Sequence, residues 1–402
     1  MCVITHNRNF LMLSTTIRPP FSFPMLVSGL VAVLVGYSSS AAIVYQAAQA
    51  AGATTLQIGG WLSALGVAMG ISSLFLSLRY RIPVLTAWST PGAALLATSL
   101  HGTTLNEAIG VFVFANVLII LCGITGLFAR MMAWIPQSLA AALLAGILLR
   151  FGLQTFTGLQ QNIALCGAMC LTWLVCRRWM PGYAILMTLL AGIVVTLGQG
   201  NVHLSLQEVH FTLPQFIMPS FNLAALVGIG LPYFLVTMAS QNAPGIATLQ
   251  AYGYKPPVSS LISWTGLIAL LFTPFGGYSV GIAAITAAIC MSEDVDADPR
   301  RRWMASALAG LFYLLAGLSG ALIGLLFSAL PPVFIQTLAG LALIATLGNS
   351  LQRAVEDVGS RDVALITFLI TASGLTLFGI GSAFWGLVGG MIAHLFLTRV
   401  RP

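Results

Sequence analysis

Three short groups of polar residues interrupt the apolar runs of this 402-residue chain, and none of the three contains a carboxylate. They offer hydroxyls, amides and backbone N–H groups instead. Such donors attract an anion, most strongly where a helix N-terminus adds its positive end. The groups therefore predict one site for a small anionic molecule. The candidate residues are Ser89, Thr90 and Gly92 in the first group, Gln241 and Asn242 in the second, and Tyr278, Ser279 and Gly281 in the third.

Each group also has a purely structural interpretation. Ser and Thr hydroxyls can bond to the preceding helical turn, glycine permits close helix packing, and amides can hold an interrupted backbone together. Trp88, Phe275 and Tyr278 could enclose an aromatic ring by offset or edge contacts, or could form ordinary packing. Both interpretations stay open at the level of sequence.

Other titratable residues lie near the expected ends of apolar runs. Glu107 fits a solvated helix end better than a proton carrier, and His101 falls in an outer loop. His394 lies in the last apolar run, where we expect a packing role. The run of acids and arginines in residues 292–302 lacks the glycine and the terminal Glu of an EF-hand, so we expect a solvated turn. The six cysteines show no metal-ligand spacing, and we expect no metal and no other cofactor.

The composition is that of a membrane protein, with 58% hydrophobic and 6% charged residues. A membrane-spanning helix needs about 20 apolar residues, and the spacing of apolar runs predicts about fourteen spans in an all-α fold. The net charge of +7 comes from basic residues between apolar runs and does not indicate nucleic-acid binding. An enzyme is not expected, because no nucleophile stands beside a base and no phosphate-loop motif is present.

The order of the apolar runs predicts two repeats. Ile82–Leu100 and Thr273–Met291 each open with Pro or Gly in extended backbone and continue as a short helix, which marks the third and tenth spans as half-helices. We expect Ser89, Thr90 and Gly92 at the N-terminus of one half-helix, and Tyr278, Ser279 and Gly281 at the N-terminus of the other. Leu235–Gln250 reads as an eighth span broken at mid-depth. The expected boundaries are a cytoplasmic arm over residues 1–22, a first repeat over 23–197, an external loop over 198–218 and a second repeat over 219–402.

The positions of the basic residues predict the orientation. With a cytoplasmic N-terminus, all but one of the 16 Lys and Arg residues fall on the cytoplasmic side; the exception is Arg150, near the outer end of a fifth span expected over Ser138–Leu153. An odd number of spans in each repeat inverts the second repeat relative to the first and leaves the C-terminus in the cytoplasm. Inverted repeats with interrupted helices are typical of secondary transporters.

Three segments carry a resemblance to a known family: TAWSTPGAALLAT, TMASQNAPGIATLQAYGYKPP and TPFGGYSVGIAAITAAICMSEDVDADPRRRW. In these, the sequence resembles the benzoate/proton symporters, relatives of the nucleobase permeases and of the sulfate and bicarbonate transporter fold. The resemblance implies a core domain of spans one to four and eight to eleven, a gate domain of the remaining spans, and substrate bound between the half-helices. It also implies uptake of benzoate or a related aromatic carboxylate with protons across the inner membrane.

One difference from the nucleobase permeases is informative. Those proteins place carboxylates in the eighth and tenth spans, where this chain has Gln241 or Asn242 and Tyr278. A buried carboxylate would repel an anionic ligand, whereas amides and hydroxyls attract it. The alternatives are another organic acid or a nucleobase-like compound as substrate, or a channel or membrane sensor. The expected partners are the small carboxylate, protons and the lipid bilayer, with no nucleic acid and with a homodimer left open.

Overall fold

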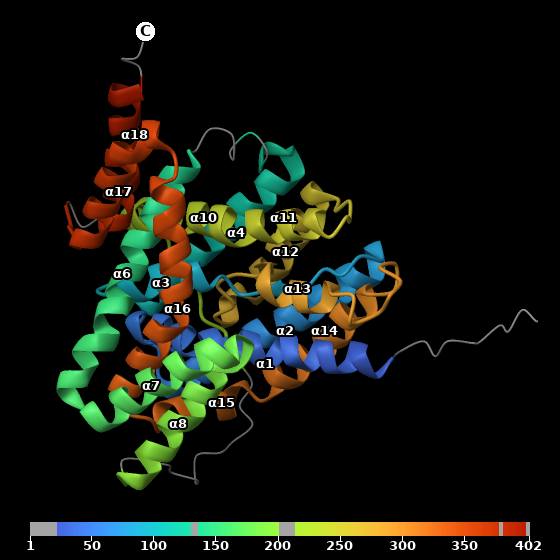
Figure 1. Ribbon diagram of the computed structural model, residues 1–402. Coiled ribbons are helices and arrows are strands. Elements are labelled where there is room, and N and C mark those ends of the chain that lie inside the picture. The colour runs from blue at the N-terminus through green and yellow to red at the C-terminus, as the bar shows by residue number, and fades with distance from the viewer. Residues whose placement is uncertain (1–21, 129, 131–135, 201–213, 378–380, 399–402) are drawn as a thin grey trace, which may run out of the picture.

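The computed structural model describes residues 22–128, 130, 136–200, 214–377 and 381–398, so the expected N-terminal arm lies outside the described residues except for its last residue. The fold is built almost entirely of helices (Figure 1). The helices of the first half are α1 (Phe23–Ala50), α2 (Thr55–Tyr80), α3 (Thr90–Ser99), α4 (Leu105–Thr125), α6 (Gln137–Gln161), α7 (Ile163–Trp179) and α8 (Ala184–Gly198). Those of the second half are α9 (Leu223–Ala225), α10 (Leu231–Thr237), α11 (Ala243–Ala251), α12 (Val258–Phe272), α13 (Ile285–Met291), α14 (Trp303–Leu318), α15 (Gly320–Ser328), α16 (Pro332–Val355), α17 (Arg361–Ser373) and α18 (Ser382–Thr398).

Six of the described helices, counting α9 to α11 as one, are long and apolar enough to cross a membrane. The count is eight if each of two bent pairs is one span. One bend of 40° lies within α1 between Tyr37 and Ser40, and the other, of 58°, separates α14 from α15. The short α3 and α13 occupy the places of the two expected half-helices, while the number of about fourteen spans stays a prediction.

The expectation of a purely α-helical fold misses one small sheet. Strands β1 (Thr86–Ala87) and β2 (Gly281–Ile282) pair antiparallel, with Thr86 opposite Ile282 and Ala87 opposite Gly281. Each strand leads toward one half-helix, and the two come from opposite halves of the chain. Extended backbone inside a membrane protein must find partners for its N–H and C=O groups, because lipid offers none. Pairing satisfies part of this need, and side chains satisfy the rest: the Thr86 N–H donates to Ser73 Oγ and the Ile282 N–H to Asn242 Oδ1.

The expected break in the eighth span is wrong in its form, because the chain from Leu223 to Ala251 is one continuous helical span. Two π-helical turns, Leu226–Gly230 and Met238–Asn242, interrupt its regular winding. Each ends two residues before a proline, which has no N–H and would clash with the carbonyl four residues earlier. In each turn the residue before the proline bonds five residues back, Leu231 to Leu226 and Ala243 to Met238. The wider turns accommodate Pro232 and Pro244 without ending the helix.

Helix contacts follow a twofold pattern. Helix α2 packs on α14, and α4 packs on α12. In the expected repeats α2 (second span) corresponds to α12 (ninth span), and α4 (fourth span) corresponds to α14 (eleventh span). Exchanging the two repeats therefore turns one of these helix pairs into the other. Helices α6 and α16 form one close pair between the halves. Figure 1 shows α6, α16, α17 and α18 on one side of the molecule and α2, α4, α12 and α14 on the other. The contacts thus divide the helices into two groups that correspond to the expected core and gate.

Glycines bring α2 and α14 into close contact. A Cβ atom added at Gly66 would lie 2.8 Å from the backbone nitrogen of Gly317, and one at Gly70 would lie 2.8 Å from the carbonyl oxygen of Gly310. Small residues allow such close approach between helices in a membrane, where packing rather than the hydrophobic effect drives association. The α2–α14 contact therefore joins a helix of the first half closely to one of the second half.

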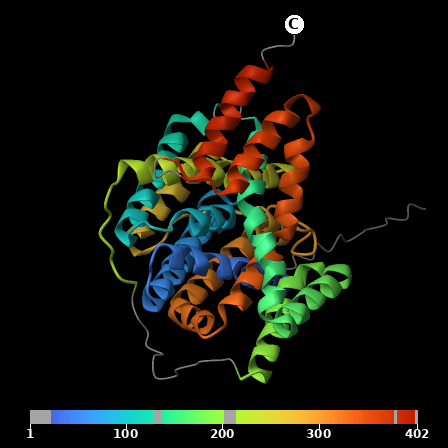
Figure 2. The same ribbon diagram turned by 90° about the vertical axis from the view of Figure 1, so that its left-hand side faces the viewer.

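The segment 214–222 runs extended along the molecule before the eighth span begins (Figure 2). The Ser220 N–H donates to the carbonyl of Asn106 at 2.9 Å, and the Asn222 side chain donates to Glu107 at 2.9 Å. Glu107 also accepts from the backbone N–H of Thr104, which completes a capping box at the start of α4. Glu107 therefore holds a helix end and a connecting segment in place.

Candidate functional site

The first predicted group lies at the start of α3. Ser89 is the N-cap of this helix, and its Oγ accepts the Gly92 N–H at 3.0 Å. Pro91 follows in the first turn, where its missing N–H costs nothing. The Thr237 hydroxyl, from the eighth-span helix, lies 3.4 Å from Ser89 Oγ and donates to it. The predicted placement of Ser89, Thr90 and Gly92 at a helix N-terminus is confirmed.

The third predicted group does not lie at a helix N-terminus. Helix α13 begins only at Ile285, whereas Tyr278 and Ser279 precede β2 and Gly281 belongs to it. The physical reason is the pairing with β1, which holds the backbone extended through Ile282 and delays the helix. Donors from this group therefore come from an extended segment beside the sheet.

The second predicted group joins the eighth-span helix to β2. Asn242 Oδ1 accepts the backbone N–H of Ile282 at 3.0 Å, and Gln241 Nε2 donates to the carbonyl of the same residue at 3.3 Å. Asn242 is fully buried, whereas Gln241 is half-buried. The two amides thus hold both backbone groups of Ile282 that face away from β1. This places Gln241, Asn242 and Gly281 together, since a Cβ at Gly281 would lie 2.8 Å from Gln241 Cγ.

Tyr278 is anchored through its backbone. Its carbonyl accepts from the Tyr233 hydroxyl at 2.8 Å and from Asn116 Nδ2 at 3.2 Å. Its ring is fully buried among Trp61, Phe112 and Tyr233, with ring centroids 6.1–6.4 Å apart. The Tyr278 hydroxyl has no hydrogen-bond partner among the described residues. A buried hydroxyl without a partner is costly, so this atom is one position where a polar ligand would be stabilised.

The three aromatic residues that could have enclosed a ligand ring lie in separate ring clusters. Trp88 Nε1 donates to Ser40 Oγ at 2.7 Å, and its ring meets that of Tyr37 edge-on at 4.7 Å. Phe275 packs on Phe216 at 5.8 Å, away from the cluster that holds Tyr278. In this structure, packing accounts for all three rings.

Sequence reasoning missed the hydroxyl groups that support β1. Thr86 Oγ1 lies 2.6 Å from Ser72 Oγ and 2.8 Å from Ser73 Oγ, and its N–H donates to Ser73 Oγ at 3.0 Å. All three side chains are fully buried. The adjacent serines in the otherwise apolar second span were the available signal, because buried hydroxyls in a membrane protein need a partner.

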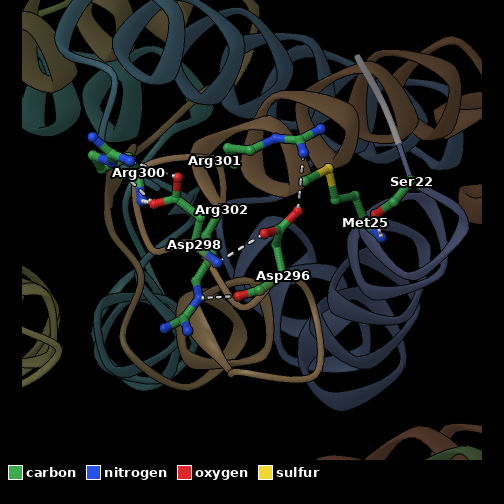
Figure 3. Close-up of polar contacts among 7 residues, drawn as sticks. All are labelled: Ser22, Met25, Asp296, Asp298, Arg300, Arg301 and Arg302. Carbon is green, nitrogen blue, oxygen red and sulfur yellow. Dashed lines mark hydrogen bonds and ion pairs between the residues drawn. The ribbon is translucent and has the colours of Figure 1, made fainter. Parts of the chain in front are cut away.

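The far end of α13 is held by an arginine. Arg302, which is only 6% exposed, donates through Nη1 to the carbonyl of Met291 at 2.8 Å. Its Nε donates to the carbonyl of Asp296, also at 2.8 Å (Figure 3). Met291 is the last residue of α13, so the cation lies at the negative end of this half-helix. The predicted solvated turn therefore also has a buried anchor.

The acids of this loop bind arginines and backbone. Asp298 pairs with Arg300 at 3.1 Å, and Asp296 lies 3.7 Å from Arg301. Hydrogen bonds from the Arg300 side chain and backbone hold the pKa of Asp298 below its usual value. Within the described ranges, no three His, Cys, Asp or Glu residues gather in a way that could hold a metal.

The predicted residues together form a buried polar centre around the sheet. Ser89, Asn242, Tyr278 and Ser279 are fully buried, and Thr90 and Gln241 are half-buried. Every one of these side chains is neutral, so the centre can donate hydrogen bonds to an anion without electrostatic repulsion. Burial of most of the donors means that a ligand reaches them only when the surrounding helices move.

Comparison with known proteins places the chain in a sequence family. The family described as benzoate membrane transport protein matches residues 19–396. The inner membrane protein YdcO of Escherichia coli K12 is 59% identical over 377 residues, which is 94% of this chain and 96% of YdcO. The benzoate membrane transport protein of Acinetobacter baylyi is 36% identical over 386 residues, covering 96% of this chain and 98% of the relative.

Solved structures show the same fold at low sequence identity. The transmembrane domain of the cyanobacterial bicarbonate transporter BicA matches with a TM-score of 0.61 and 14% identity, over 93% of this chain and 98% of that domain. SLC26A9 matches with a TM-score of 0.60 and 11% identity, over 92% of this chain and 65% of its own. The chain shares the fold of these two proteins, which confirms the predicted fold class, while the count of seven spans in each repeat stays a prediction.

Proposed function

The chain belongs to the benzoate membrane transport family and is a multi-pass membrane transporter, and from this premise we propose that it takes up benzoate or a related aromatic carboxylate together with protons. The observation that carries the proposal is the polar centre at the β1–β2 sheet, which offers neutral donors from Ser89, Gln241 and Tyr278 and no carboxylate. A carboxylate ligand needs such donors.

Coupling to protons follows from the energetics of anion uptake. Moving one negative charge inward against an inside-negative potential of about 100 mV costs about 2.3 kcal/mol. A proton carried with the anion removes this net charge and adds the energy of the proton gradient. Coupled uptake can therefore concentrate a carboxylate that would otherwise be excluded from the cell.

Alternating access provides the mechanism. The core group (α1–α4 and α9–α15) carries the polar centre, and the gate group (α6–α8 and α16–α18) packs against one side of it. Movement of the core relative to the gate exposes the buried donors to one side of the membrane and then to the other. The two repeats, over residues 23–197 and 219–402, supply the equivalent halves of this movement, with both termini in the cytoplasm. A homodimer would fix the gate groups in the membrane.

Transport by purified protein in liposomes tests the proposal. Counterflow of radiolabelled benzoate into vesicles preloaded with benzoate should occur, and net uptake should rise with an inward proton gradient and fall with an uncoupler. Uracil and an aliphatic acid such as propionate serve as comparison substrates. Counterflow with uracil alone would assign the protein to a different substrate class, and absence of counterflow with every compound would favour a channel or a sensor.

A further inference from the structure

A cavity of about 400 Å³ lies between the core and gate groups at the outer ends of α1 and α3. Its volume falls within the range of about 300–1,000 Å³ that is usual for small-molecule sites. The cavity is bounded by α1, α3, α6 and the start of α16, and it lies at the opposite end of α3 from Ser89. It is therefore a different place from the polar centre.

Arg150 lines this cavity and is unusual in its position along its helix. The sequence suggested a position near the outer end of a span ending at Leu153, but α6 continues to Gln161 and places Arg150 close to the middle of a 25-residue helix. Every other charged residue in the helices named above lies in a terminal turn. Charged residues within membrane-spanning helices are rare and usually face a cavity, where they mark functional positions. The Arg150 side chain is exposed and faces this cavity.

No carboxylate among the described residues compensates the charge of Arg150. None of the ion pairs among the described residues includes it, and no acidic residue lines the cavity. Its guanidinium lies against Gly374, the residue that ends α17. The negative end of that helix stabilises the cation but leaves its charge uncompensated by any carboxylate. The wall of the cavity that contains Arg150 therefore carries a positive charge.

The remaining lining suits an aromatic carboxylate. Phe151, Leu330 and Ile335 form an apolar surface, and amides surround the rest. Gln46 donates to the carbonyl of Ile335 at 3.4 Å, and this bond connects α1 in the core with α16 in the gate. The polar side chains lining the cavity besides Arg150 include Gln46, Gln49, His101, Gln154 and Gln336.

We propose that this cavity is an outer binding site for carboxylate anions, with Arg150 as its charged partner, from which the substrate reaches the polar centre. The assignment rests on the proposed function for its choice of aromatic acid. Arginine binds carboxylates through its planar fork of N–H donors, often with two parallel hydrogen bonds. Because the site contacts both core and gate, an anion bound there lies where the two groups separate.

The test uses Thr98→Cys, at the cavity wall, in a background free of other cysteines. Two membrane-impermeant methanethiosulfonates, one with a sulfonate and one with a trimethylammonium group, are compared by their labelling rates. The ratio of the anionic to the cationic labelling rate should be higher at Thr98→Cys than at Gly198→Cys, which lies outside the cavity. Adding Arg150→Gln should lower the ratio at Thr98→Cys by about tenfold, the equivalent of one lost charged contact. The ratio cancels any change in thiol reactivity. Arg150→Lys should keep most of the preference for the anionic reagent at Thr98→Cys. Arg177→Gln, which removes an exposed charge on α7, should leave the rate ratio unchanged.

Ligand protection gives the second measurement. Benzoate should slow labelling of Thr98→Cys, and the neutral benzamide should not; Arg150→Gln should abolish the protection. A rate ratio unaffected by Arg150→Gln, or equal protection by benzoate and benzamide, would overturn the outer site. If the parent protein shows benzoate counterflow but neither effect, the outer site fails while the proposed function stands. Charge selectivity at Thr98→Cys without benzoate counterflow would instead retain the anion site and reject the proposed substrate.

Discussion

The side-chain oxygen of Asn242 lies 3.0 Å from the backbone nitrogen of Ile282 and accepts its hydrogen bond. Ile282 pairs in turn with Thr86 of the first half, so this bond connects the eighth-span helix to the sheet that joins the two halves. Asn242 is fully buried. The contact therefore holds the polar centre together whether or not a ligand is bound.

Asn242→Ala should lower the free energy of unfolding by about 1–3 kcal/mol, because it leaves the buried Ile282 N–H without an acceptor. The thermal midpoint of the purified protein in detergent measures the loss. Gln250→Ala, on the exposed side of the same span, is the matched control and should leave the midpoint unchanged. Equal midpoints for the two variants would show that the Asn242 bond does not support the fold.

Gly66→Ala should also destabilise the protein, through overpacking. The added Cβ would lie 2.8 Å from the backbone nitrogen of Gly317, and neither helix backbone can move without disturbing its neighbours. Such overpacking costs about 1–3 kcal/mol. Gly198→Ala, where no atom lies within 4 Å of the added Cβ, is the control for the same substitution. A thermal midpoint equal to that of the control would mean that α2 and α14 are less closely packed than described.

The half-helices could be predicted because their signals are local. Ser89 followed by Pro91 marks a helix start, and Pro83 before it favours an extended approach. The pairing of β1 with β2 could not be predicted, because two residues on each side form it and their partners are far apart in sequence. For the same reason the start of α13 was placed too early.

Two further differences arise from tertiary context. Ser240, Asn242 and Pro244 are typical of a helix break, yet a π-helical turn absorbs the proline and keeps the span continuous. The position of Arg150 along its helix depends on where α6 ends, and an apolar run alone does not show that α6 continues to Gln161. The presence of these spans could therefore be predicted from the sequence. The ends of the helices and the surroundings of single polar residues depend on tertiary contacts and could not.

The Asp298–Arg300 pair predicts a pH dependence of stability. The Arg300 side chain lowers the pKa of Asp298 in the folded state, so the pair stabilises the fold at pH values above the ordinary Asp pKa of about 4 and loses this effect as the pH falls through the lowered value. Asp298→Asn should lower the thermal midpoint near neutral pH, and the difference from the parent should vanish in acid. Asp294→Asn, an exposed acid in the same loop, is the control. A difference that grows in acid would contradict the pairing.

The orientation in the membrane predicts which sides are accessible. On a cysteine-free background, Ala297→Cys, exposed in the loop before α14, should react only with a reagent supplied from the cytoplasm. Gly198→Cys, at the end of α8, should react only from outside. Impermeant maleimide applied to intact cells and to inverted vesicles measures both. Reaction of Ala297→Cys in intact cells would reverse the orientation, and reaction of both positions from one side would reject the inverted arrangement.

Gln241 separates ligand contact from support of the sheet. Its amide donates to the carbonyl of Ile282, and its side chain is half-buried, so part of it remains available to a ligand. Gln241→Glu keeps size and shape but adds a carboxylate that repels both the Ile282 carbonyl and a bound benzoate. Benzoate binding should weaken most at high pH and recover in part at lower pH, because a buried carboxyl has a raised pKa and, once protonated, donates again. Gln241→Ala should instead lose about 1–3 kcal/mol of binding free energy at every pH.

Equilibrium binding of radiolabelled benzoate above about pH 5.5, where its own carboxyl stays ionised, provides the measurement. If folded Gln241→Glu binds benzoate as well as the parent at every pH, Gln241 supports the sheet without contacting the substrate.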